Sequence, residues 1–300
     1  MSSQATPTVP RLSSSVIVIN HLSEILFVHR NPKAGAFAGM HVFPGGNYDS
    51  KQDDSLAMTA IRETFEETGL LLASSRADSA PADDELNARR EKVHSQKRLF
   101  SEFLTEYNLT PDVSALMRFT QWTTPTNMPR RFQTQFFVTF LDAPASGFTD
   151  GNKLDRLPTP DGGQEVIAAR FIHPAAALRE YESKQISLMP PQFYLLTTLA
   201  PLLTGNANAE RQRARVETLA RSAFGSLSIH PVSLKQGAPD GWMHMVYEGD
   251  ELHGGQKGCL HRSVVKVGKG GSISEIILQR SFDVFGDLPR GCVTENLSKL

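Results

Sequence analysis

One arginine and three glutamates fall within positions 62–67. A helix would place Glu63, Glu66 and Glu67 on one side, with Cβ atoms about 5–6 Å apart. Three carboxylates so close repel each other, and a bound divalent cation would convert that repulsion into ligation. Hard oxygen ligands suit Mg²⁺ or Mn²⁺, which also bind the phosphate oxygens of a substrate. Arg62 precedes Glu66 by four residues and is expected to hold that carboxylate in position.

The same spacing also fits a solvent-facing helix that Arg–Glu ion pairs stabilise, with no chemistry attached. The sequence upstream of the glutamates distinguishes the two interpretations. Residues 43–46 read Phe-Pro-Gly-Gly, and Gly45 and Gly46 let the backbone turn tightly and approach a ligand closely. Aspartates follow at positions 49, 53 and 54. This combination favours a metal-dependent site.

The surrounding sequence predicts the elements that would carry these residues. Residues 16–19 and 25–29 are expected to form a hairpin, and residues 56–68 a helix that ends at Gly69. Further strands are expected at 116–122, 133–141 and 165–172, and further helices at 174–183, 191–203 and 208–222.

Two segments stand apart by composition. Residues 76–110 mix both charge signs densely and predict a helical insertion whose charges form a solvated face. Its apolar side chains fit one helical stripe, formed by Val93, Phe100, Phe103, Leu104 and Tyr107. Residues 206–297 predict a β-rich C-terminal extension. With residues 1–14 as a flexible arm, the main domain is expected at 15–205.

Bulk composition excludes several classes of protein. The hydrophobic fraction of 40% and charged fraction of 21% are typical of a soluble globular enzyme. A net charge of −1 provides no whole-molecule field for nucleic acid or membrane surfaces. No apolar run reaches the ~20 residues of a membrane span, and no secretory signal is recognisable. Cys259 and Cys292 lack metal-ligand spacing and suit a reducing compartment, although a disulfide stays open.

Residues 62–70 read Arg-Glu-Thr-Phe-Glu-Glu-Thr-Gly-Leu and resemble the end of the Nudix box, the motif of the Nudix hydrolases. The resemblance implies a Nudix fold, an α/β/α sandwich around a mixed β-sheet, and cleavage of a nucleoside diphosphate derivative. It also implies a catalytic and metal-binding set formed by Arg62, Glu63, Glu66, Glu67 and Gly46. Fifteen residues separate Gly46 from Arg62, two more than in the usual box, and the acidic residue eight before Arg62 is Asp54 rather than Glu. The longer loop leaves the role of Asp54 open.

The segment before the box resembles the coenzyme A diphosphatase motif of the same superfamily. Arg30 and Gly39 fall in register with that motif, whereas Gly35 replaces its second arginine. Arg30 is therefore a predicted contact for substrate phosphates, together with Gly45 and Gly46, because a guanidinium pairs well with phosphate oxygens. The alternative for Arg30 is a surface arginine at the end of a strand.

Residues 122–137 are similar to long Nudix proteins that include the mammalian peroxisomal coenzyme A and acyl-CoA diphosphatases. This resemblance covers about residues 15–200 and makes Arg130 and Arg131 predicted contacts for phosphate or adenine. The alternative for both is an exposed turn before a strand. Glu165 is predicted as an extra metal ligand or general base, and its alternative is an ordinary carboxylate at the start of a strand.

The final residues Ser298, Lys299 and Leu300 form Ser-Lys-Leu, which the peroxisomal import receptor reads. The sequence thus predicts a peroxisomal hydrolase that uses Mg²⁺ or Mn²⁺. Its expected reaction splits coenzyme A or acyl-CoA into 3′,5′-ADP and (acyl-)4′-phosphopantetheine. Two alternatives stay open: a Nudix pyrophosphatase acting on NADH or ADP-ribose, and a catalytically weak ligand-binding protein with the same fold. Nothing in the sequence resembles a thioesterase.

Overall fold

The computed structural model of the chain describes residues 8–33, 37–75, 83–141, 161, 163, 165–205, 207–235, 237–268, 273–289 and 292. The predicted features that lie wholly or partly outside the described residues include the N-terminal arm, Gly35, the start of the insertion, parts of the C-terminal extension and the C-terminal tripeptide. Along the described chain, no helix has the length and apolar character needed to cross a membrane.

The chain divides into two compact units, each assembled from separate stretches. The larger unit comprises Ser13–Met117 and Phe136–Glu217. The smaller unit comprises Met1–Leu12, Arg118–Gln135 and Thr218–Leu300. The predicted glutamates, Arg30 and Glu165 all belong to the larger unit.

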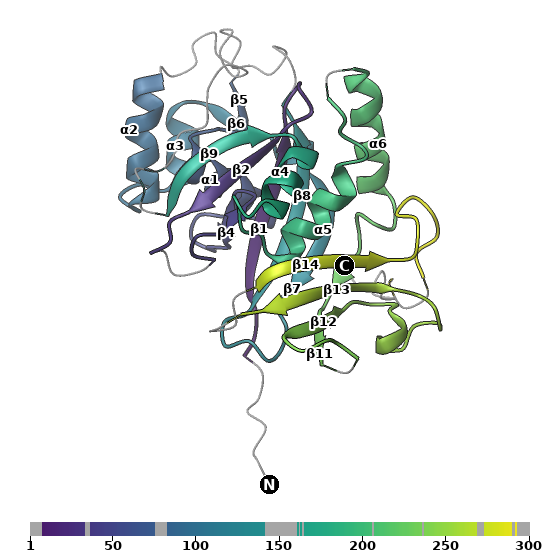
Figure 1. The fold of residues 1–300 in the computed structure, drawn as a ribbon. Helices are drawn as coiled ribbons and strands as arrows, with labels where there is room; N and C mark the ends of the chain where they lie inside the picture. Colours follow the sequence, from purple (N-terminus) through teal and green to yellow (C-terminus); the bar gives the residue numbers. More distant parts are fainter. Residues whose placement is uncertain are drawn as a thin grey trace. The chain divides into compact units, whose positions relative to one another are not determined.

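The strands of the larger unit are built on the predicted hairpin (Figure 1). In it, β1 (Arg11–Ile19) turns into β2 (Ile25–Arg30), with Ile19 opposite Ile25. β1 also pairs with β4 (Gly45–Asn47), and β2 pairs with β3 (His41–Val42) and β9 (Val166–Ile172), all antiparallel. A separate pair is formed by β5 (Ala73–Ser75) and β6 (Leu109–Pro111). These pairings bring Arg30 and the start of β9 next to each other.

The helix that carries the glutamates is α1 (Leu56–Thr68), and local signals fix both of its ends. The Ser55 side chain accepts a hydrogen bond from the Met58 N–H, which caps the first turn. Gly69 follows at φ 71° and its N–H donates to the Phe65 carbonyl. Glycine adopts this left-handed conformation without a steric penalty, so the predicted helix ends where expected. The apolar side of α1 packs in one core with Val16.

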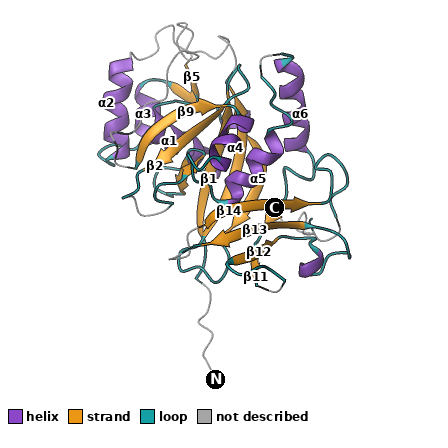
Figure 2. Cartoon of the chain, in the orientation of Figure 1, coloured by secondary structure: helices purple, strands orange, loops and turns teal. Residues whose placement is uncertain are grey.

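The described part of the insertion contains the helices α2 (Asp83–His94) and α3 (Phe100–Glu106), which are labelled in Figure 2. The apolar residues predicted to lie on one helical stripe are divided between α2, which ends at His94, and α3, which begins at Phe100. Gln96 adopts a φ of 54°, and the Arg98 N–H donates back to the Lys92 carbonyl. Both helices contribute apolar side chains to the core of the larger unit. There the Phe103 ring stacks on the Phe65 ring, with centroids 5.2 Å apart.

The remaining elements of the larger unit follow the predicted order. A 3₁₀ turn, η1 (Val113–Ala115), comes after β6. The predicted helices appear as α4 (Pro174–Glu182), α5 (Pro190–Leu199) and α6 (Ala209–Arg221), the last extending into the smaller unit. Prolines occupy the first turns of α4 and α5, where a missing N–H costs no hydrogen bond. α4 and α5 pack against each other.

The smaller unit contains the predicted β-rich extension. Its antiparallel sheet consists of β11 (Val232–Leu234), β12 (Trp242–Val246), β13 (His261–Val267) and β14 (Ile273–Arg280), with a 3₁₀ turn, η2 (Glu251–His253). In this unit β10 (Ser228–Ile229) pairs in parallel with β7 (Met117–Thr123), and β8 (Phe132–Phe140) is divided between the units. Parallel and antiparallel pairs thus coexist, which confirms the predicted α/β class with a mixed sheet. Cys259 and Cys292 are both free thiols.

Candidate active site

The three glutamates of α1 gather in a largely buried position. Their side chains are 16% exposed at Glu63, 10% at Glu66 and 2% at Glu67. Buried carboxylates cost free energy unless they are paired or bind a cation. The alternative of a solvent-facing helix held by surface ion pairs is therefore wrong for this part of α1.

Arg62 lies among the carboxylates and is itself only 4% exposed. Its Nη1 lies 3.0 Å from an oxygen of Glu66 and 3.0 Å from an oxygen of Glu63, so the predicted contact with Glu66 is present. Its Nε and Nη2 donate to both oxygens of Asp53, at 2.8 and 2.9 Å. Burial by itself would lower the pKa of Arg62, but the surrounding carboxylates outweigh burial and raise it.

Asp53 is a site residue that the sequence reasoning did not single out. Its carboxylate binds Arg62 and also accepts hydrogen bonds from the Thr59 hydroxyl and the Asp49 N–H. The neighbouring Asp54, to which the motif spacing pointed, is exposed. The signal in the sequence was the run of aspartates after the glycines, but which one faces Arg62 depends on the path of the loop.

Glu67 is bound from the strands rather than from its own helix. Arg30 of β2 places Nη1 2.8 Å from one oxygen of Glu67 and Nη2 2.8 Å from an oxygen of Glu165. The Gly45 N–H donates to the second oxygen of Glu67 at 3.0 Å. Arg30 is 12% exposed, so it is not a surface arginine, and Glu165 is half exposed. The structure thus brings Arg30 and Glu165 to the glutamates, with Arg30 bound to carboxylates.

Gly45 and Gly46 lie close to other atoms of the protein, and the ligand contacts predicted for them stay predictions. A Cβ at Gly45 would lie 2.2 Å from the Ser14 carbonyl oxygen, so a side chain there would separate β4 from β1. A Cβ at Gly46 would lie 2.3 Å from the carboxyl carbon of Glu63. The absence of a side chain at Gly46 is what lets Glu63 lie against the backbone beside the other glutamates.

The carboxyl groups of Glu63 and Glu67 are strongly perturbed. Burial raises the pKa of Glu63 to about 7. The charge of Glu66 also raises this pKa, and the charge of Arg62 lowers it. Burial raises the pKa of Glu67 to about 8. The charge of Glu63 also raises this pKa, and the charge of Arg30 lowers it. The two arginines therefore do not fully compensate the buried carboxylates. A cation bound among them would favour their ionised forms.

The insertion contributes two further residues that the sequence reasoning missed. Arg90 of α2 is buried and its Nε donates to the Glu66 carbonyl at 2.8 Å. His94, the last residue of α2, places Nδ1 3.6 Å from an oxygen of Glu66. Its Nε2 lies 3.9 Å from an oxygen of Asp161. The contact with Glu66 raises the pKa of His94, against the effect of burial.

The donor set suits a divalent cation, although the arginines occupy it. Among the described residues, no group of three or more His, Cys, Asp or Glu side chains is arranged to hold a metal ion. The three glutamates offer only hard oxygen donors, as Mg²⁺ and Mn²⁺ prefer. Burial raises the pKa of Glu63 and of Glu67, and a bound cation would favour the ionised form of both. The chemistry of these three glutamates therefore fits the ion. A bound ion would compete with the arginines for their carboxylates. Ligation by Gly46 and Glu165 stays a prediction.

Arg130 and Arg131 belong to the smaller unit. Arg131 donates from Nε to the Thr124 carbonyl at 3.0 Å and from Nη1 to the Thr8 carbonyl at 2.6 Å. Arg130 lies in an exposed turn before β8. The substrate contacts predicted for both arginines stay predictions.

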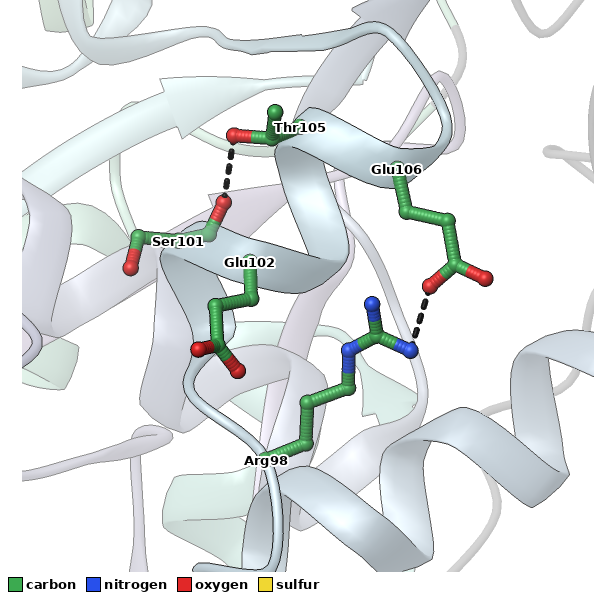
Figure 3. A pocket seen from close by; sticks show the side chains of 5 residues that line it. All are labelled: Arg98, Ser101, Glu102, Thr105 and Glu106. Atoms are coloured by element: carbon green, nitrogen blue, oxygen red, sulfur yellow. Dashed lines mark hydrogen bonds and ion pairs between the residues drawn. The ribbon is translucent and has the colours of Figure 1, made fainter.

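Two open pockets lie on the insertion, and neither is lined by a predicted site residue. One pocket is lined by Lys92, Lys97, Arg98 and Glu102. The other, drawn in Figure 3, shows Arg98 paired with Glu106 and the Thr105 hydroxyl bonded within α3. Lys92, Lys97 and Glu102 on this surface are exposed, as predicted for a solvated face.

Comparisons with known proteins identify the kind of domain that carries this site. Residues 51–199 match the family model described as the NUDT19 Nudix domain. A protein named acyl-coenzyme A diphosphatase NUDT19 from Gallus gallus is 26% identical over 241 residues, covering 59% of this chain and 61% of that relative. The Homo sapiens protein of the same name is 29% identical over 214 residues, covering 67% and 52%. The chain thus spans between 52% and 61% of the length of these relatives.

A solved structure supports the same assignment of the fold. The crystal structure of a NUDIX hydrolase from Alicyclobacillus acidocaldarius matches with a TM-score of 0.53 at 25% identity. The match covers 65% of this chain and 92% of that one. The glutamates of α1 lie inside the residues that match the family model.

Proposed function

The chain belongs to the Nudix hydrolase superfamily, and on that basis we propose that it hydrolyses the diphosphate of coenzyme A or acyl-CoA. Water adds to one phosphorus and a P–O bond of the diphosphate breaks, giving 3′,5′-ADP and 4′-phosphopantetheine or its acyl form. The observation that carries the proposal is the buried glutamate cluster of α1, within residues that match the domain of acyl-CoA diphosphatase relatives.

Proteins of this superfamily generally use divalent metal ions, and Glu63, Glu66 and Glu67 would hold Mg²⁺ or Mn²⁺ through their oxygens. When bound, such an ion polarises the diphosphate and lowers the pKa of the attacking water. Arg62 orients the site by holding oxygens of Glu63 and Glu66. The Nε and Nη2 atoms of Arg62 bind Asp53, so the guanidinium is held in one orientation.

Arg30 is the best-placed candidate for the substrate phosphates. It lies beside the glutamates and is bound by Glu67 and Glu165. Arg30 would bind phosphate oxygens most readily when Glu67 holds a metal ion, because the ion and Arg30 would share the charge of one carboxylate. Glu165 is half exposed next to it and is the proposed extra ligand or base. Arg130 and Arg131 are proposed to contribute further contacts.

The substrate proposal is tested by a panel of possible substrates. Purified protein with Mg²⁺ or Mn²⁺ is expected to release 3′,5′-ADP from coenzyme A and acyl-CoA, identified by mass spectrometry. 3′-Dephospho-CoA, NADH and ADP-ribose should be cleaved more slowly, because they lack the 3′-phosphate that arginine contacts would recognise. Preferential cleavage of NADH or ADP-ribose would replace the proposed substrate, and binding without turnover would favour a ligand-binding protein.

The proposed location is the peroxisomal matrix. It rests on Ser298, Lys299 and Leu300, outside the described residues, and on the proposed substrate. A fluorescent protein fused to the N-terminus should give punctate fluorescence that overlaps a peroxisomal marker, and removal of the three residues should make it diffuse. Punctate fluorescence that survives the removal would contradict recognition by the import receptor.

A further inference from the structure

Two polar side chains of the insertion are directed at one residue of the catalytic helix, Glu66. Arg90 and His94 are four residues apart on α2 and therefore lie on one side of that helix. Arg90 binds the main-chain carbonyl of Glu66 at 2.8 Å, and His94 faces its carboxylate at 3.6 Å. Apolar packing of the insertion on Phe65 explains why α2 and α3 stay attached. It does not explain two polar side chains directed at one residue.

The two oxygens of Glu66 are contacted from different elements. Arg62, on α1 itself, donates to Oε1 at 3.0 Å. His94, on α2, faces Oε2. A carboxylate contacted at both oxygens from different directions loses rotational freedom, and the direction of a carboxylate decides how well it binds a metal ion.

His94 is itself held between two carboxylates. On the side away from Glu66 it faces Asp161, whose side chain is 2% exposed and accepts hydrogen bonds from the N–H groups of Gly163 and Glu165. Its Nδ1 is buried, and within the described part of the chain it has no hydrogen-bond partner. A buried ring nitrogen without a hydrogen bond costs free energy, and the carboxylate that lies next to this one is Glu66.

We infer that His94 is a positioning residue for Glu66, so that the helical insertion is part of the catalytic site rather than a separate appendage. Arg90 holds the backbone of Glu66 through a hydrogen bond, and the His94 ring lies against one oxygen of its carboxylate as a charged neighbour. This inference rests on the proposed function in one respect, the role of Glu66 as a metal ligand. It does not depend on which diphosphate is the substrate.

The test compares two variants of His94 with a matched control. His94→Ala removes the ring, His94→Gln restores a donor of similar reach, and Lys92→Ala changes an exposed residue two positions earlier on α2. Binding of Mn²⁺ alone is measured from the free-ion signal in electron paramagnetic resonance, and folding from the thermal unfolding midpoint. We expect His94→Ala to weaken Mn²⁺ binding about 10- to 100-fold, the range typical for partners of metal ligands.

His94→Gln should recover part of that loss, while Lys92→Ala should match the wild type in Mn²⁺ binding and unfolding midpoint. Wild-type Mn²⁺ affinity in His94→Ala would overturn the inference. So would a parallel loss of affinity and folding that glutamine does not restore, since that would mean a structural role only. If the wild type binds Mn²⁺ but does not cleave coenzyme A, the substrate proposal fails and this inference stands.

Discussion

Replacing Glu67 by Gln, or Glu66 by Gln, is expected to lower the turnover number by roughly two to four orders of magnitude. Glutamine keeps the volume of the side chain and can still accept the Gly45 N–H at position 67. It removes the negative charge that the proposed metal ion requires. The measurement is the initial rate at saturating coenzyme A and metal ion, with circular dichroism to confirm the fold.

The control for this pair is Glu182→Gln at the exposed end of α4, which should leave turnover unchanged. Comparing the same substitution at these positions shows whether turnover falls because a charge of the buried cluster is lost or because any carboxylate is lost. Turnover near the wild-type level in both Glu66→Gln and Glu67→Gln would mean that this cluster is not the metal site.

Asp53→Asn is expected to destabilise the protein by about 3 kcal/mol, the lower end of the range for breaking a buried ion pair. The side chain of Asp53 is fully buried and receives two hydrogen bonds from Arg62. The lower end applies because Glu63 and Glu66 would still compensate part of the Arg62 charge. Urea unfolding of the metal-free protein measures the change without a contribution from metal binding.

Asp54→Asn provides the matched control, because Asp54 is next to Asp53 in the chain and is exposed. Its free energy of unfolding should stay within about 0.5 kcal/mol of the wild type, as for most surface substitutions. Equal destabilisation by the two variants would contradict the assignment of Asp53 as the buried partner of Arg62.

The sequence by itself determined the catalytic helix and its carboxylates. The spacing of Glu63, Glu66 and Glu67 fixes their side of α1, because residues three and four apart on a helix are neighbours. Gly69 ends the helix by its left-handed conformation. All of these depend on local backbone geometry, which a short stretch of sequence specifies.

Only the tertiary structure decided which remote groups surround those carboxylates. Arg30 is 37 residues from Glu67 and 135 residues from Glu165 along the chain, yet it binds both. The choice of Asp53 over Asp54 followed from the path of the loop, and the approach of His94 to Glu66 from the packing of the insertion on α1. Contacts of this kind depend on how separate segments pack, and residue type and spacing do not encode that packing locally.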